Sequence, residues 1–232
     1  EITDTGIFLL NVQMIGLLVG GIFWGILGDK RGRLSVLFGS IFMYSTANIA
    51  NGFVNTVEAY AFWRFIAGFG LAGELGAGIT LVAEIMPKEK RGYATTIVAA
   101  VGVSGAVAAY FVAQYFDWRT SFFIGGGLGL SLLLLRFGVA ESGMFGKANT
   151  HHASRGDFFS LFTNYTRFIK YLRCIVIGVP LWFVVGILIT LSPEFGKVLN
   201  VQGDVSAGAA VACCYAGLVL GDIASGLLSQ IL

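Results

Sequence analysis

Long apolar stretches separated by short polar breaks dominate this chain. A helix needs about 20 apolar residues to cross roughly 30 Å of hydrocarbon, and stretches of that length recur along all 232 residues. Only 12% of the residues are charged, about half the share typical of soluble domains. The sequence therefore predicts an all-α membrane protein. Seven transmembrane helices are expected, at residues 7–28, 34–53, 57–86, 93–116, 118–139, 172–198 and 205–232.

Basic residues are distributed unevenly over the polar breaks. Most of the 15 Lys and Arg follow the first, third or fifth predicted span. Since basic loops stay on the cytoplasmic side, the first span is predicted to run from outside to inside. The formal net charge of +2 is too small to indicate a nucleic-acid partner. The expected surroundings are a lipid bilayer.

The first and last predicted spans share a pattern of small residues. Their spacing is identical in Gly16, Gly20, Gly25 and Gly28 and in Gly217, Gly221, Gly226 and Ser229. Coincidence is the alternative in a chain with 33 glycines, but a repeat is typical of transporters built from two homologous halves. It predicts six helices in each half, with this chain showing the second to the eighth of twelve. The predicted domains are an N-terminal half at 1–145, a cytoplasmic linker at 146–171 and the start of a C-terminal half at 172–232.

The end of this linker has two interpretations of equal weight. Aromatic and aliphatic residues recur there at helical spacing beside Arg167, Lys170 and Arg173. This pattern favours a basic amphipathic helix on the membrane surface. It equally fits an early start of the sixth span.

The most specific motif follows the first span. Gly25, Asp29, Lys30, Gly32 and Arg33 match the pattern G-x-x-x-D-R/K-x-G-R. In this the chain resembles the major facilitator superfamily, whose signature lies between its second and third helices.

Further residues extend the resemblance. Arg64 with Gly68 and Gly70 is similar to the arginine motif of the fourth helix. Glu84, Arg91 and Glu141 stand in motifs similar to those after the fourth and sixth helices.

The resemblance implies a helical bundle that works by alternating access. It also implies a charge network among Asp29, Arg33, Glu84, Arg91 and Glu141 that closes the cytoplasmic side. From the residues alone, these charges are equally explained as solvated anchors, with each pair contributing about 0 to 1 kcal/mol.

Three charged residues fall inside predicted spans, namely Arg64, Glu74 and Asp222. A charge near mid-bilayer costs about 2.5 to 3.5 kcal/mol, so such residues usually face a partner or a water-filled path. Arg64 and Glu74 are ten residues apart, or about 15 Å along a helix, which argues against an ion pair within the helix. We expect all three to belong to a substrate or proton pathway.

The function predicted from the resemblance is secondary active transport, not an enzymatic reaction. The chain is most similar to metabolite:proton symporters and sugar porters, which implies uptake of a small polar or anionic organic solute with protons. One alternative is a drug or solute efflux antiporter, although the fourth span lacks the proline of the drug-antiporter motif G-x-x-x-G-P. The other is a truncated membrane protein that does not transport. We expect a monomer in the plasma membrane, specifically a bacterial inner membrane. No cofactor or metal is expected, because Cys174, Cys213 and Cys214 lack metal-binding spacing.

Overall fold

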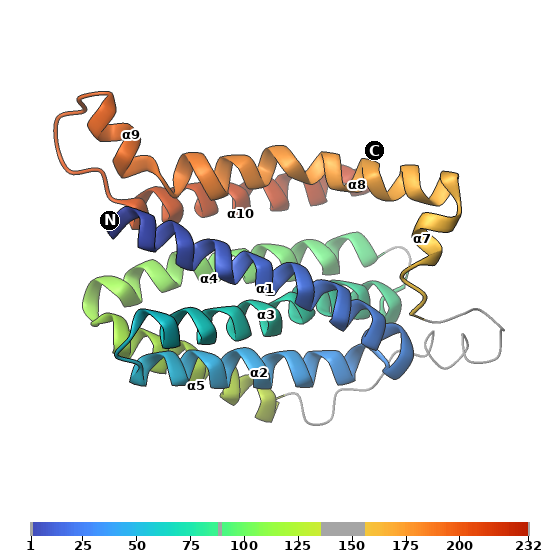
Figure 1. Ribbon diagram of the computed structural model, residues 1–232. Coiled ribbons are helices and arrows are strands. Elements are labelled where there is room, and N and C mark those ends of the chain that lie inside the picture. The colour runs from blue at the N-terminus through green and yellow to red at the C-terminus, as the bar shows by residue number, and fades with distance from the viewer. Residues whose placement is uncertain (1, 88–89, 136–155, 232) are drawn as a thin grey trace. The chain divides into compact units, whose positions relative to one another are not determined.

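The structure is a computed structural model that describes residues 2–87, 90–135 and 156–231. Every regular element in these ranges is a helix (Figure 1). The elements are α1 (Ile2–Arg31), α2 (Arg33–Phe53), α3 (Val57–Ile85), α4 (Arg91–Tyr115), α5 (Trp118–Leu135), α7 (Ser160–Thr163), α8 (Tyr165–Phe183), the π-helix η1 (Val184–Ile189), α9 (Ser192–Val198) and α10 (Ala207–Ile231).

Within the described ranges, six helices are long and apolar enough to cross a membrane, whereas the sequence predicted seven. The difference is α2, which is helical but does not belong to this set. Its polar residues Ser40, Ser45 and Asn51 are fully buried against neighbouring helices. They lower the mean hydropathy of α2 although their side chains are buried, and its role as a seventh span stays a prediction.

The sixth predicted span also differs from the structure. The span begins at Tyr165, seven residues before the expected start, and ends at Ile189. Residues 192–198, predicted to complete it, form the separate helix α9. Residues 165–171 therefore belong to the helix of the candidate span, which agrees with the early start and not with a separate surface helix. Before them, α7 forms a short helix of its own.

The chain forms two compact units, which are described here separately. One contains residues Glu1–Arg91 and Phe116–Phe158, and the other Gly92–Tyr115 and Phe159–Leu232. These units group α4 with the C-terminal helices, unlike the predicted division at 1–145, 146–171 and 172–232. That division concerns repeated halves and stays a prediction.

Close helix packing in the first unit depends on glycine. Helix α3 contacts both α1 and α2, and α2 also contacts α5. A Cβ atom on Gly20 would lie 2.8 Å from the Cα atom of Phe69, and one on Gly16 would lie 3.1 Å from the Phe65 carbonyl carbon. On the other side of the interface, Gly68 approaches the Gln13 carbonyl group equally closely. Small residues thus let α1 and α3 meet backbone to backbone, as in many membrane bundles.

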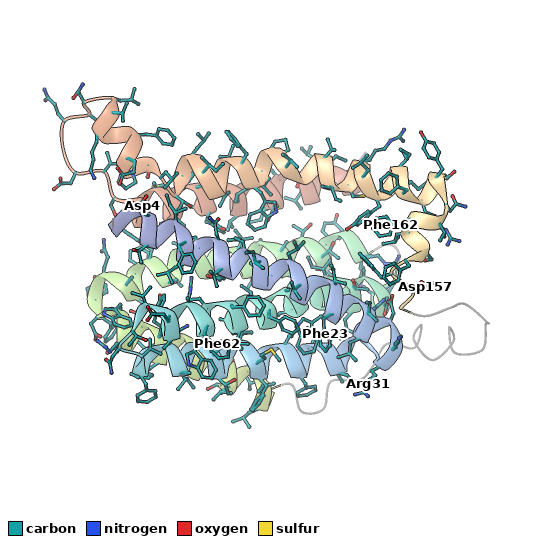
Figure 2. The ribbon with its side chains drawn as sticks, in the orientation of Figure 1. Asp4, Phe23, Arg31, Phe62, Asp157 and Phe162 are labelled. Carbon is teal, nitrogen blue, oxygen red and sulfur yellow. The ribbon has the colours of Figure 1, made fainter. Side chains whose placement is uncertain are left out.

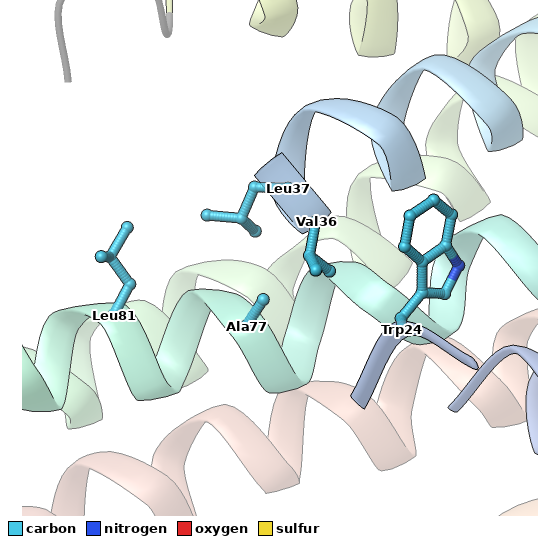
Figure 3. Packing of buried hydrophobic residues seen from close by; sticks show 5 residues of the cluster. All are labelled: Trp24, Val36, Leu37, Ala77 and Leu81. Atoms are coloured by element: carbon cyan, nitrogen blue, oxygen red, sulfur yellow. The ribbon is translucent and has the colours of Figure 1, made fainter. Parts of the chain in front are cut away.

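Trp24 fills the space between α1, α2 and α3. It heads a buried cluster with Val36, Leu37, Ala77 and Leu81 (Figure 3). Its indole N–H donates a hydrogen bond of 2.8 Å to the backbone carbonyl of Phe69.

The ring of Trp24 has room because two neighbours are glycines. A Cβ atom on Gly39 would lie 2.9 Å from the ring, and one on Gly73 would lie 2.8 Å from it. The three helices are therefore joined by one large side chain that is both packed and hydrogen-bonded.

The second unit contains an irregular transmembrane helix. Pro180 lies inside α8 and cannot donate a backbone hydrogen bond, and the helix widens into η1 four residues later. The hydroxyl of Thr190 donates to the carbonyl of Val185 at 2.8 Å. A π-helical segment of this kind often marks a functional region.

Candidate functional site

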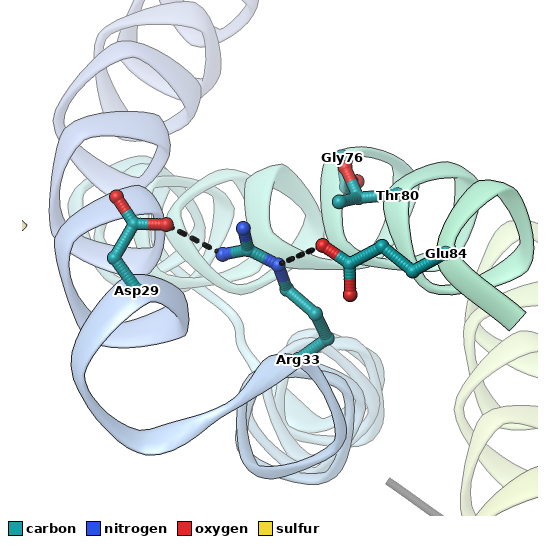
Figure 4. A network of polar contacts seen from close by, with 5 residues as sticks. All are labelled: Asp29, Arg33, Gly76, Thr80 and Glu84. Atoms are coloured by element: carbon teal, nitrogen blue, oxygen red, sulfur yellow. Dashed lines mark hydrogen bonds and ion pairs between the residues drawn. The ribbon is translucent and has the colours of Figure 1, made fainter. Parts of the chain in front are cut away.

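Three of the charged residues predicted for the cytoplasmic gate, Asp29, Arg33 and Glu84, meet where α1, α2 and α3 lie side by side. Nη1 of Arg33 lies 2.7 Å from Oδ1 of Asp29, and Nε of Arg33 lies 3.7 Å from Oε1 of Glu84 (Figure 4). Asp29 is near the end of α1, Arg33 begins α2, and Glu84 is in the last turn of α3. One guanidinium group therefore links the ends of three helices.

The two ion pairs have different exposure. The Asp29 side chain is 48% exposed, whereas that of Glu84 is only 19% exposed. Water screens the pair between Arg33 and Asp29 more strongly. The pair between Arg33 and Glu84 is more sheltered, so its electrostatic attraction is weakened less by solvent. It is also the pair that joins residues far apart in the sequence.

Two glycines make this geometry possible. Gly32 has a φ of 93°, a conformation that disfavours residues with a Cβ atom, and its N–H bonds the carbonyl of Gly28 at 3.1 Å. A Cβ atom on Gly28 would lie 3.1 Å from Nη1 of Arg33. Gly25 belongs to the motif, yet a Cβ atom there would meet nothing within 4 Å among the described residues. The motif pointed to Gly25, and the glycine in contact with Arg33 is Gly28.

The remaining charged residues predicted for the gate are Lys30, Arg91 and Glu141. Lys30 is exposed, and Arg91 is half-buried at the start of α4. Glu141 lies outside the described residues.

Residue Gly156, which the motifs did not indicate, packs against the end of α1. A Cβ atom at this position would lie 2.9 Å from the Ile26 carbonyl oxygen and 3.1 Å from Cε of Lys30. Its φ of 65° also favours glycine. The only signal in the sequence was a glycine between charged residues, which is too general to identify such a contact.

Arg64 lies on α3 beside aromatic rings. The carbon at the centre of its guanidinium group is 6.0 Å from the ring centroid of Tyr60 and 5.8 Å from that of Phe122. These are cation–π distances, and the side chain is half-buried. In the described part of the chain, Arg64 has these ring contacts and no ion pair.

The two intramembrane acids belong to different units. Glu74 is half-buried on α3, between Gly73, which packs on Trp24, and Gly76. Asp222 is half-buried on α10. Within the described part of the first unit, Glu74 forms no ion pair with Arg64.

A second polar cluster, which the motifs did not indicate, lies at the start of α5. Nη2 of Arg119 donates to the carbonyl of Val54 at 3.1 Å and to Oδ1 of Asn55 at 2.8 Å. Its guanidinium group lies 4.3 Å from the ring centroid of Trp118. Arg119 therefore ties the turn between α2 and α3 to α5.

Asp117 caps the first turn of α5 beside it. Its carboxylate accepts hydrogen bonds from the hydroxyl of Thr120 at 2.5 Å and from the N–H of Arg119 at 3.0 Å. The Thr120 hydroxyl, and then the backbone N–H groups, hold the pKa of Asp117 below its ordinary value.

The chain is similar to known membrane transporters. It is 35% identical over 123 residues to the niacin transporter NiaP of Acinetobacter baylyi, a match that covers 51% of this chain and 28% of that protein. It is 32% identical over 149 residues to the sialic acid transporter NanX of Escherichia coli, covering 60% and 37% of the two chains. The chain thus spans well under half the length of these relatives.

The fold is also similar to a solved structure. The inward-open xylose transporter XylE from Escherichia coli superposes with a TM-score of 0.58 at 17% identity, covering 97% of this chain and 56% of that one. The described helices of this chain therefore follow that fold. Residues 3–232 match the Major Facilitator Superfamily, and the chain belongs to this family of membrane transport proteins, which are not enzymes.

Proposed function

We propose that the protein takes up a small organic anion, specifically a carboxylic acid, by proton-coupled symport. The observation that carries this proposal is the surroundings of Arg64. Its guanidinium group lies on a candidate membrane helix, contacts the rings of Tyr60 and Phe122, and has no ion pair among the described residues. Such a cation is costly in hydrocarbon unless an anion or water reaches it. Niacin and sialic acid, which give two relatives their names, are both carboxylic acids.

Glu74 is the proposed proton carrier, with Asp222 as the second candidate. A carboxylate inside the membrane can load and release a proton, and Glu74 shares α3 with Arg64. Substrate and proton would therefore act on the same helix. A ligand drives a conformational change only when it binds one state better than the other, and protonation supplies that difference.

The cluster of Asp29, Arg33 and Glu84 is proposed as a gate on the cytoplasmic side, with Lys30 and Arg91 beside it. The ion pairs of Arg33 support this role because they join three helix ends at once. Breaking them would free the ends of α1 and α3 to separate. Glu141 is proposed to complete the network.

The proposed topology has α2 as a seventh span, so that the chain corresponds to helices 2–8 of twelve. Its contacts with α3 and α5, both candidate spans, support this place. The bacterial sources of the relatives support a place in a bacterial inner membrane, where we propose that the protein is a monomer. Basic residues at the end of α1 support a cytoplasmic position for that end.

The test is uptake of radiolabelled niacin and benzoate, as two small carboxylic acids, by the full-length protein in proteoliposomes. With the interior alkaline, we expect accumulation above the external concentration, and none without a pH gradient. Glu74→Gln should abolish accumulation and retain exchange of internal for external substrate. The Glu74→Asp variant keeps the carboxylate and serves as the control.

Two outcomes would contradict the proposal. Accumulation that is independent of the pH gradient would remove the proton coupling. Unchanged accumulation in Glu74→Gln would transfer the role to Asp222 or to another acid.

A further inference from the structure

We propose that the corner formed by α7 and the first three turns of α8 binds an anionic phospholipid of the cytoplasmic leaflet. The basic side chains are Arg167, Lys170 and Arg173, all of them exposed. The proposal concerns a lipid site outside the transport pathway, and it uses the proposed cytoplasmic orientation of this end.

The three basic residues form a stripe along one side of α8. They occur every third residue, so successive side chains rise by about 4.5 Å and remain on neighbouring positions of the helix surface. The sequence of α8 contains no acidic residue. In the ranges that the structure describes, no ion pair involves any of the three.

Aromatic residues of α8 and of the adjoining α7 lie next to this stripe, because Tyr171 is four residues after Arg167. The ring centroid of Phe162 lies 6.0 Å from that of Phe168 and 6.4 Å from that of Tyr171, so α7 folds back on the first turns of α8 (Figure 2). Phe159 and Tyr165 are 77% and 79% exposed. Aromatic side chains of this kind anchor at the level of lipid headgroups.

The length of the helix places the stripe at that level. The candidate span Tyr165–Ile189 has 25 residues, or about 37 Å, against about 30 Å of hydrocarbon. We assign the excess of about 7 Å, somewhat more than one turn, to the end that carries Arg167 and Lys170. Arg173 is deeper, and its long side chain can extend its charge back toward the headgroups.

The start of α8 is held firmly enough to present this stripe. Oδ1 of Asn164 accepts hydrogen bonds from the N–H groups of Thr166 at 3.0 Å and Arg167 at 3.4 Å. This cap orients the first turn, and the ring contacts of Phe162 hold it from the other side. A cation stripe next to exposed rings fits a molecule with an anionic headgroup and acyl chains better than it fits a free anion.

The test is native mass spectrometry of the full chain in detergent with an equal mixture of phosphatidylglycerol and phosphatidylcholine of identical acyl chains. We expect the wild type to retain phosphatidylglycerol preferentially. The Arg167→Gln/Lys170→Gln variant should lose about five-fold of this preference for each basic residue removed. Arg167→Lys, which keeps the charge, should retain it.

The matched control is Arg31→Gln/Lys90→Gln, which removes two exposed basic residues from other helix ends. It should retain the wild-type preference. Equal loss in both double variants would overturn the proposal, because the effect would then be one of net charge. Equal retention of the two lipids by the wild type would also overturn it, and neither readout depends on transport.

Discussion

Arg33 is the residue on which the proposed gate depends. Its guanidinium group contacts the carboxylate of Asp29 at the end of α1 and the carboxylate of Glu84 in the last turn of α3. Gly28 and Gly32 are both needed for it to fold back over the turn. A charged hydrogen bond of this kind contributes about 1.5 to 3 kcal/mol when sheltered and much less when exposed.

Replacing Asp29 with Asn should slow uptake by about ten-fold or more, since the ion pair that orients Arg33 loses its charge. The variant should still insert in the membrane, because Asp29 is half-exposed at a helix end. Initial uptake rates in proteoliposomes, normalised to inserted protein, measure the effect. The control is Asp29→Glu, which keeps the charge, and uptake of Asp29→Asn at the wild-type rate would contradict the gate.

Replacing Asp117 with Asn should lower the thermal unfolding midpoint at pH 7, and this effect should shrink at low pH, once the pH falls through the folded-state pKa. The folded-state pKa of Asp117 lies below its ordinary value, so the ionised carboxylate stabilises the protein above pH of about 4. This contribution disappears as the pH falls through the folded-state pKa. Midpoints measured in detergent at both pH values test the sign, and a difference that persists at low pH would contradict it.

Sequence reasoning identified the members of the Arg33 cluster but not the residues that support it. Asp29, Arg33 and Glu84 were recognisable because they stand in a known motif and carry charge. Gly28 and Gly156 were not, because Gly28 stands at a variable position of the motif and the role of Gly156 depends on contacts with Ile26 and Lys30, far away in the sequence. Such contacts between distant parts of the chain leave no local pattern.

Helix packing in the first unit is decided by which face of each helix carries glycine. A Cβ atom on Gly20 would lie 2.8 Å from the Cα atom of Phe69, whereas one on Gly21 would meet nothing within 4 Å in the described part of the chain. Neighbouring glycines on one helix therefore have opposite roles. One permits contact with α3, and the other is open to substitution.

Replacing Gly20 with Ala should destabilise the protein by about 1 to 3 kcal/mol, because the backbone of α3 has to move away. Replacing Gly21 with Ala is the matched control, and it should be neutral or stabilising by up to about 1 kcal/mol, since Ala favours the helix. Thermal unfolding midpoints of the two variants in the same detergent give the comparison. A Gly20→Ala variant as stable as Gly21→Ala would show that α1 and α3 do not touch there.

At the scale of elements, the long apolar stretches predicted where helices lie more accurately than they predicted which residues belong to each membrane span. The predicted stretch 34–53 differs from α2 by only one residue at its start. The sequence predicted it as a span, but α2 is not among the six candidate spans, and the polar residues Ser45 and Asn51 lower its mean hydropathy. The end of α8 was missed because residues 184–189 remain apolar while the helix changes to a π-helix.

At the scale of the whole molecule, the proposed pathway requires Arg64 and Glu74 to be reachable from water. Cysteine at either position, with Cys174, Cys213 and Cys214 replaced by Ser, should react with a small aqueous thiol reagent in the full-length protein. Cysteine at Ile41, which is fully buried, is the control and should stay unlabelled. Absence of labelling at both test positions, with and without substrate, would assign them to packing.

The buried polar residues of α2 also have a consequence for biosynthesis. A helix that carries Ser40, Ser45 and Asn51 enters a bilayer poorly when it is alone. The turn at Gly32 joins α2 directly to α1, so the two helices form a hairpin that can leave the translocon together. Glycosylation mapping should show α2 inserting efficiently behind α1 and poorly behind an unrelated leader helix. The order in which the ribosome releases these helices therefore becomes part of what determines the finished fold.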